Sequence, residues 1–235
     1  MTKEQAADRI KQLSRELDEH NHRYYIDAAP IISDFDFDIL LKELESLEKE
    51  FPEFRLPDSP TLRVGGGITK EFQTIKHRYP MLSLSNTYND EDLDEFDARV
   101  KKLLGDEPYQ YVCELKYDGV AIGLHYKDGL LMQALTRGDG VQGDDITTNA
   151  KTIRSIPLRL KNNTNSKNFP DDFEIRGEIY MPRKVFDRIN QEKAAAGDAL
   201  LANPRNSAAG TLKMQDSAVV SSRQLDCFLY FVLGD

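Results

Sequence analysis

The sequence predicts an α+β fold, in which a small helical arm precedes a mainly antiparallel β-sheet domain. Apolar residues near the N-terminus recur at three- and four-residue spacing, which is typical of amphipathic helices. Later in the chain, strand-like runs are separated by turn residues, and Lys127-Asp128-Gly129 joins two of these runs as a hairpin would. Because hairpins connect antiparallel strands, we expect an antiparallel sheet.

Two helices are expected in the arm. Residues 3–20 carry the first apolar stripe and residues 36–50 carry the second. These stripes consist of Ala6, Ile10, Leu13 and Leu17, and of Phe37, Leu40, Leu41, Leu44 and Leu47. The segment between them, 24–34, is expected to be irregular, since Pro30 breaks helices. Gly65-Gly66-Gly67 resembles a flexible joint, so we place a domain boundary near residue 68 and predict domains 1–68 and 69–235.

The body is expected to combine strands with a few helices. A helix at 90–104 has Asn89 as its N-cap, with Leu93, Phe96, Val100 and Leu103 on one face. A second helix begins at Pro182, as its N1 residue, and ends near residue 195. A short helix is expected at 145–153 and a polar loop at 161–172. Strands are expected at 109–116, 119–126, 130–136, 173–181 and 225–233.

Composition and charge limit the function classes. The 235 residues carry a net charge of −9, and residues 1–60 hold fifteen acidic and eight basic side chains. This balance argues against a stand-alone DNA-binding module, because phosphate contacts require positive charge. Neither a membrane-spanning run nor a signal peptide is present, so we expect a cytoplasmic protein without membrane contact. Cys113 and Cys227 are expected to be buried, reduced thiols, and two cysteines alone cannot make a structural zinc site.

Lys116 is the strongest candidate for chemistry. If residues 109–116 form a strand, Glu114 and Lys116 project from the same face. A lysine whose amine is neutral can act as a nucleophile, and desolvation or nearby cations favour the neutral amine. The alternative for this short segment is a salt bridge at a strand end, just before the Asp118-Gly119 turn.

Four segments, taken in order, favour a nucleophilic Lys116 over a salt bridge at a strand end. Lys116-Tyr117-Asp118-Gly119 resembles the KxDG motif of covalent nucleotidyltransferases, a group that includes DNA and RNA ligases and mRNA capping enzymes. The next three segments are Thr136-Arg137-Gly138-Asp139-Gly140, Glu174-Ile175-Arg176-Gly177-Glu178, and the run from Ala202 to Leu212. In this order, the segments resemble bacterial NAD+-dependent DNA ligases, and the last segment is the most specific to that family.

The arm supports the same family. Its aromatic and acidic residues resemble the arm that folds over the nicotinamide mononucleotide half of NAD+: Tyr24, Tyr25, Asp34, Phe35, Asp36, Phe37 and Asp38. Aromatic faces can stack on a positively charged pyridinium ring, and carboxylates can balance its charge. The family usually has Tyr where this chain has Phe37, so a hydroxyl contact is lost at that position.

The resemblance implies a reaction and a set of roles. Lys116 would attack the α-phosphate of NAD+ to form ligase-AMP, while Asp118 and Gly119 shape the turn that presents it. Positioning and charge stabilisation dominate such phosphoryl transfers, so Mg2+ is implied, although no residue is assigned as a metal ligand. Glu114 would read the adenine edge, Glu178 the ribose hydroxyls, and Arg137 the ribose or phosphate. Four further residues are assigned by resemblance: Ser83 and Leu84 border the adenosine pocket, and Arg205 and Lys213 contact phosphate or DNA. Lys213 stands where the family commonly has Arg, which puts a bidentate phosphate contact in doubt.

The resemblance also implies what lies outside the sequence. The body would be a nucleotidyltransferase domain of the ATP-grasp-like ligase type, incomplete at its C-terminus, because two later lysine motifs do not occur. We therefore expect a fragment with impaired turnover. The full-length enzyme is expected to be a monomer that acts on nicked double-stranded DNA and holds zinc only in the absent C-terminal part. The fragment itself would bind NAD+, nicotinamide mononucleotide or an inhibitor. Two alternatives stay open: an ATP- or GTP-using nucleotidyltransferase, and a module that binds NAD+ or its nicotinamide half without turnover.

Overall fold

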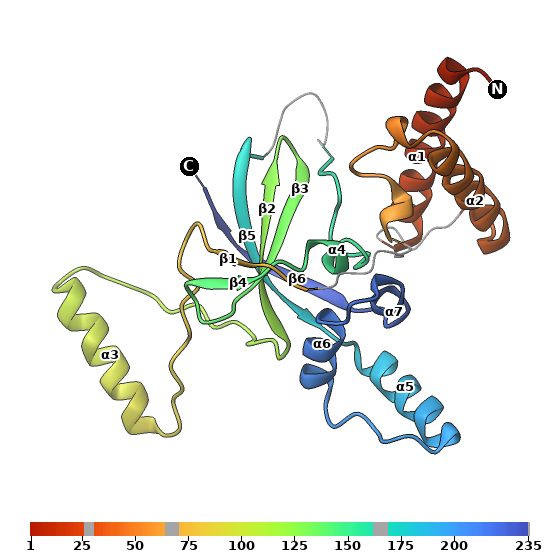
Figure 1. Ribbon diagram of the computed structural model, residues 1–235. Helices are drawn as coiled ribbons and strands as arrows, with labels where there is room; N and C mark the ends of the chain where they lie inside the picture. The colour runs from red at the N-terminus through yellow and green to blue at the C-terminus, as the bar shows by residue number, and fades with distance from the viewer. Residues whose placement is uncertain (26–30, 64–70, 162–168, 235) are drawn as a thin grey trace.

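The arm is a pair of antiparallel helices (Figure 1). The computed structural model describes residues 1–25, 31–63, 71–161 and 169–234. Helix α1 spans Lys3–Tyr25 and helix α2 spans Asp34–Glu50. Ile10, Leu13 and Leu17 of α1 pack against Leu44 and Leu47 of α2. The predicted stripes are therefore the arm core, although α1 continues five residues beyond the predicted end.

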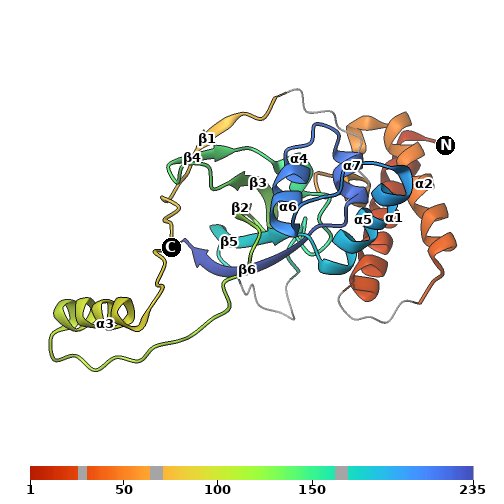
Figure 2. The same cartoon turned by 90° about the horizontal axis from the view of Figure 1, so that it is seen from below.

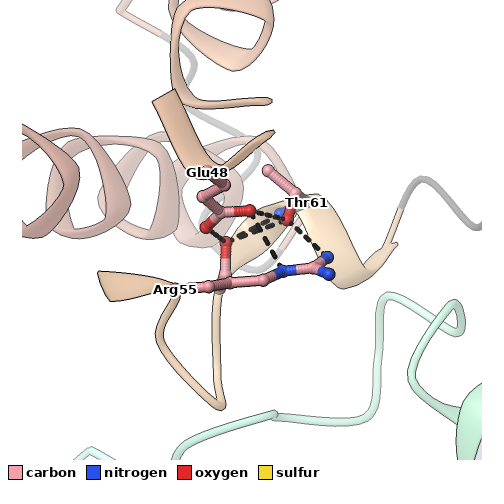
Figure 3. Close-up of polar contacts among 4 residues, drawn as sticks. Glu48, Arg55 and Thr61 are labelled. Atoms are coloured by element: carbon pink, nitrogen blue, oxygen red, sulfur yellow. Dashed lines mark hydrogen bonds and ion pairs between the residues drawn. The ribbon is translucent and has the colours of Figure 1, made fainter. Parts of the chain in front are cut away.

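A buried carboxylate secures the chain where it leaves the arm (Figure 3). Two short 3-10 helices, Pro52–Phe54 and Pro60–Arg63, follow α2. Glu48 accepts hydrogen bonds from the hydroxyl groups of Ser59 and Thr61, at 2.5 and 2.6 Å, and pairs with Nε of Arg55 at 3.1 Å. Since Glu48 is buried, these three donors replace the water that its charge loses. The exit is thereby held against the end of α2.

The body is built on a four-stranded antiparallel sheet with strand order β3-β2-β5-β6. The strands are β2 (Val120–Lys127), β3 (Leu130–Thr136), β5 (Asp172–Tyr180) and β6 (Asp226–Leu233). The β2–β3 hairpin turns at Asp128 and Gly129, whose φ angles are +50° and +77°, as a two-residue Asp-Gly turn requires. A separate two-stranded sheet pairs β1 (Thr74–Lys76) with β4 (Gln142–Asp144). The predicted α+β class is confirmed.

Helices cover the sheet and close its core. They are α4 (Thr147–Ala150), α5 (Arg183–Ala196), α6 (Pro204–Leu212) and α7 (Ser217–Ser222). Helix α6 packs on β2 and β5, and α7 lies beside both α4 and α6 (Figure 1). Alternate residues of β2, among them Ile122 and Leu124, are fully buried together with Ala208 and Leu212 of α6. The sheet face beneath α6 is therefore the core of the body.

Several local predictions need correction. The helix expected at 145–153 is reduced to the four residues of α4, and Pro182 is the N-cap of α5 and not its N1 residue. Helices α6 and α7 were not predicted, although Asn203 caps α6 and Pro204 opens it. Residues 162–168 of the predicted polar loop, and the boundary near residue 68, lie outside the described residues.

Helix α3 (Asp90–Leu104) forms as predicted, but its apolar face is not covered. Asn89 caps the helix by accepting a hydrogen bond from the backbone N–H of Asp92, at 2.8 Å. The apolar face remains open, since Leu93 is 54% exposed and Leu103 is 86% exposed. Figure 2 shows α3 apart from the sheet, as does Figure 1. The helix thus follows from local signals, and its packing does not.

Candidate functional site

The start of β2 and the end of β5 bring the predicted catalytic residues together. The backbone N–H of Gly119 donates a hydrogen bond of 3.1 Å to Oε1 of Glu178. Arg205 Nη1 lies 3.3 Å from Asp118 Oδ1. Burial raises the pKa of Glu178, whereas the Gly119 N–H and the positive charges of Lys116 and Arg205 act in the opposite direction. Gly119 and Asp118 thus contact residues that lie about sixty and ninety positions away in the sequence.

Backbone contact explains why glycine stands beside this carboxylate. An added Cβ at Gly119 would lie 2.1 Å from the carbonyl oxygen of Ile179 and 3.1 Å from Cγ of Glu178. Only a residue without a side chain lets the two chains approach so closely. The turn at Asp118-Gly119 is therefore seated directly on β5.

Helix α6 carries Arg205, the guanidinium that pairs with Asp118. Asn203 accepts a hydrogen bond from the backbone N–H of Asn206, at 2.8 Å, and Pro204 follows as the first helical residue. Arg205 consequently lies in the first turn of α6, where it reaches Asp118. The cap and the proline thus decide the place of Arg205.

The strand predicted at residues 109–116 is wrong. Within the described part of the chain, residues 107–118 adopt neither helix nor strand. A strand requires a neighbouring backbone for its hydrogen bonds, and the sheet order β3-β2-β5-β6 contains no pairing with this segment among the described residues. Glu114 and Lys116 are both exposed, so the expectation that they share a strand face is withdrawn. Cys113 lies in the same segment and is exposed, which also corrects its predicted burial.

Arg137 lies at the β3 end of a row of residues that crosses the sheet. Ala121, Glu178 and Phe228 occupy paired positions on β2, β5 and β6. The backbone N–H of Arg137 donates to the carbonyl oxygen of Ala121, at 3.1 Å, and His77 Nε2 lies 2.9 Å from the Arg137 carbonyl oxygen. Arg137 therefore follows β3 directly and is bonded to Ala121, the residue of β2 that pairs with Glu178.

The segment that holds Ser83 and Leu84 is attached to the body just before these residues. Arg176 donates hydrogen bonds to the carbonyl oxygens of Tyr79, at 2.7 Å, and Pro80, at 3.0 Å. Ser83 and Leu84 themselves are exposed and lie outside any helix or strand. Arg176 therefore acts on the backbone of this segment, a contact that no sequence signal had indicated.

Lys213 pairs with a carboxylate. Lys213 is the C-cap residue of α6, and its Nζ lies 2.8 Å from Oδ2 of Asp144 in β4. The lysine is 59% exposed, so this pair contributes little to stability. The structure thus places Lys213 on the same helix as Arg205, at the opposite end.

The predicted arm residues differ in their surroundings. The hydroxyl of Ser33 accepts a hydrogen bond from the N–H of Asp36 and donates one to its carboxylate, so Asp36 takes part in the N-cap of α2. Phe37 is half-buried against the arm core, whereas Phe35 is 74% exposed, and Asp38 is exposed. The side chains of Tyr24, Tyr25 and Asp34 lie outside the described residues.

Three aromatic residues beside Glu178 were missed by the sequence reasoning. The rings of Tyr117 and Phe228 stack with centroids 4.1 Å apart, and those of Tyr180 and Phe228 with centroids 4.7 Å apart. Tyr117 was visible inside the KxDG-like segment, but its partners come from β5 and β6. Only strand pairing could have indicated them.

Among the residues that the structure describes, no group of three or more His, Cys, Asp and Glu side chains could hold a metal ion. Within the same ranges, none of the helices has both the length and the apolar character that a membrane crossing requires.

Comparison with known proteins matches both parts of the chain. Residues 69–234 match the family model of the NAD-dependent DNA ligase adenylation domain, and residues 3–65 match that of the DNA ligase-like, N-terminal NAD+-binding domain. A DNA ligase of Cytophaga hutchinsonii is 56% identical over the whole chain, and one of Bacteroides fragilis is 53% identical over 97% of it. In both cases the chain covers 34% of the relative, so it spans about a third of the length of these curated relatives.

Proposed function

Because the chain belongs to the NAD-dependent DNA ligase family, we propose that it performs the adenylation step, in which Lys116 takes AMP from NAD+. One observation carries the proposal. Lys116, Asp118 and Gly119 lie beside Glu178 of β5, and Arg205 of α6 reaches the same cluster. A nucleophile, a carboxylate and a guanidinium are thereby gathered where a nucleotide can be held.

The proposed step is a single nucleophilic displacement at the α-phosphorus of NAD+. The lone pair of the neutral Lys116 amine attacks the α-phosphorus of NAD+ and forms a P–N bond. The bond from that phosphorus to the bridging oxygen breaks, and nicotinamide mononucleotide leaves with the electron pair. The amine gives up its proton to solvent. In the whole ligase, AMP would then pass to the 5′-phosphate of a nick in double-stranded DNA, where the 3′-hydroxyl displaces it.

Each residue of the body then has a proposed role. Glu178 accepts hydrogen bonds from the ribose hydroxyls, and Glu114 reads the adenine edge. Asp118 shapes the turn that presents Lys116. Ser83 and Leu84 are assigned to the adenosine pocket, and Arg137 to the ribose or phosphate of the cofactor. Arg205 and Lys213 are assigned to phosphate or DNA. Fixed positive charges of this kind stabilise the charge that develops during phosphoryl transfer.

The residues present do not form a Mg2+ site by themselves, since the described part of the chain has no cluster of metal-binding side chains. Proteins commonly hold Mg2+ through one or two carboxylates and the phosphates of the substrate.

We propose that the arm recognises the leaving half of NAD+. The residues assigned to it are Tyr24, Tyr25, Asp34, Phe35, Asp36, Phe37 and Asp38. The exposure of the Phe35 ring supports this role, because an exposed aromatic face is available for stacking. Phe37 contributes to the arm core as well, and Asp36 to the cap of α2. The division between arm and body near residue 68, a monomeric state and a cytoplasmic location are further parts of the proposal.

Intact mass after incubation with NAD+ tests the proposal. We expect an added AMP that peptide mapping assigns to Lys116 in the whole ligase that contains this chain, and little adduct on residues 1–235 alone. Lys116→Arg keeps the charge but stays protonated, so it should acquire no AMP. Lys127→Arg, on the exposed β2–β3 hairpin, is the matched control and should label normally.

Three outcomes separate the alternatives. An adduct on Lys116→Arg would overturn the assignment of the nucleophile. An adduct formed from ATP but not from NAD+ would indicate an ATP-using nucleotidyltransferase. A binding module would be indicated if calorimetry detects NAD+ binding but no adduct forms. This result would have to hold for the whole ligase and for residues 1–235, with and without Mg2+.

A further inference from the structure

The segment that carries Lys116 is held from its C-terminal side. Residues 107–118 lie outside helices and strands in the described chain, and Glu114, Leu115 and Lys116 are exposed. Upstream, the hydroxyls of Tyr109 and Tyr111 donate to Asp97 of α3, which itself lies apart from the sheet. The contacts that tie Lys116 to the sheet are therefore those of the residues that follow it.

The first of these following residues, Tyr117, is held by an aromatic stack. Its ring lies 4.1 Å from that of Phe228, with an interplanar angle of 21°. Phe228 stacks in turn on Tyr180, with centroids 4.7 Å apart and an interplanar angle of 4°. The hydroxyl of Tyr180 donates to Oδ2 of Asp226, at 3.1 Å, which secures the far member of the stack. Near-parallel rings at these separations attract each other beyond the apolar area that they bury.

The stack stands beside Glu178, the carboxylate that is proposed to bind the ribose hydroxyls. Phe228 is the residue of β6 that pairs with Glu178 of β5, so their side chains share one face of the sheet. Tyr117 reaches Phe228 across this face, and Lys116 is its neighbour in the chain. The strands that fix Glu178 thus also fix the ring that holds Tyr117.

We infer that Tyr117 is a positioning residue, which holds Lys116 at the α-phosphate through its stack on Phe228 and Tyr180. The inference rests on the proposed function, since it assigns Tyr117 a part in the adenylation step. An exposed lysine on an irregular segment samples many positions, and a nucleophile must meet phosphorus within a narrow range of distance and angle. Loss of the stack should therefore slow the attack of Lys116 on phosphorus. The contacts that Glu178 makes with the nucleotide should remain.

Single-turnover labelling with NAD+ tests the inference in the whole ligase that contains this chain. Tyr117→Leu removes the ring, and we expect the rate of AMP-adduct formation at saturating NAD+ to fall roughly tenfold or more. The NAD+ concentration for half-maximal rate should stay within about twofold of the wild type, because the binding residues are unchanged. Tyr117→Phe keeps the stacked ring and should restore the wild-type rate.

Two further variants distinguish positioning from a general loss of order. Tyr111→Leu removes another exposed ring from the same segment, one that contacts Phe96 and Tyr109. It should leave the rate of adduct formation within about twofold of the wild type. Phe228→Leu should lower the rate as Tyr117→Leu does, and the double variant should be no slower than either one, because both changes break the same stack.

The possible failures are distinct. A wild-type rate in Tyr117→Leu, while Lys116→Arg stays unlabelled, would overturn the inference and leave the proposed function standing. Equal losses in Tyr111→Leu and Tyr117→Leu, or a slow Tyr117→Phe, would also overturn it. Peptide mapping that places AMP on a residue other than Lys116 would overturn the proposed function, and with it the inference.

Discussion

The backbone N–H of Gly119 donates a hydrogen bond of 3.1 Å to Oε1 of Glu178, and this bond connects the start of β2 to β5 beside Lys116. The contact depends on the absence of a side chain at position 119. It also gives a partly buried carboxylate one of the donors that it needs. Substitutions at Gly119 and at Glu178 can test the two sides of this contact separately.

Gly119→Ala should impair both folding and adenylation. Its Cβ would lie 2.1 Å from the carbonyl oxygen of Ile179, so β2 and β5 must move apart. We expect the free energy of unfolding to fall by about 2 kcal/mol or more, as overpacking does in other cores. Gly210→Ala is the control, because nothing lies within 4 Å of the added Cβ in α6. Urea denaturation of the two variants checks the prediction, and equal stabilities would contradict it.

Glu178→Gln should change how stability depends on pH. Burial raises the pKa of Glu178 above its ordinary value of 4.5, so the folded chain binds this proton more tightly than the unfolded chain does. The wild type should therefore lose stability relative to Glu178→Gln as the pH rises from 4.5 through the raised pKa. Urea midpoints across this range measure the difference. Glu107→Gln, at an exposed position, is the control substitution. A wild type that gains stability relative to Glu178→Gln as the pH rises would refute the assignment.

Glu48→Ala should destabilise the exit of the arm. The substitution removes the carboxylate that accepts from the buried hydroxyls of Ser59 and Thr61 and forms an ion pair with Arg55. A loss of about 2–4 kcal/mol is expected for a broken buried network of this kind. Glu45→Ala, at an exposed position of α2, should unfold as the wild type does. Thermal unfolding compares them, and similar midpoints for both variants would show that the network contributes little.

Alanine substitutions at Phe35 and Phe37 should have different effects, on NAD+ binding and on the stability of the arm respectively. Phe37→Ala removes a ring that is half-buried against the arm core, and should lower stability by about 2 kcal/mol. Phe35→Ala removes a ring that is 74% exposed, and should keep stability while weakening NAD+ binding. Calorimetry with NAD+ and thermal unfolding give the two readouts. If Phe35→Ala binds NAD+ as the wild type does, Phe35 has no part in the proposed nicotinamide site.

Part of the local structure of this protein could be predicted from the sequence alone. Asn89 caps α3, Asp128 and Gly129 form the hairpin turn, and the leucine spacing in α1 and α2 matches their buried stripes. These features depend on interactions between residues only a few positions apart, so the sequence pattern contains the information they need. Lys116, Glu178 and Arg205 were instead identified by the resemblance of their segments to the motifs of NAD+-dependent DNA ligases.

Tertiary structure decided how those residues meet and which segments are ordered. The expected strand at 109–116 did not form, because β-structure requires a partner backbone and the alternation of side chains cannot supply one. The pairing of β5 with β2 and β6 brings Glu178 to Gly119 and Phe228 to Tyr117. Such contacts join residues about sixty to one hundred and ten positions apart. Their geometry depends on strand register and helix packing, which no local pattern specifies.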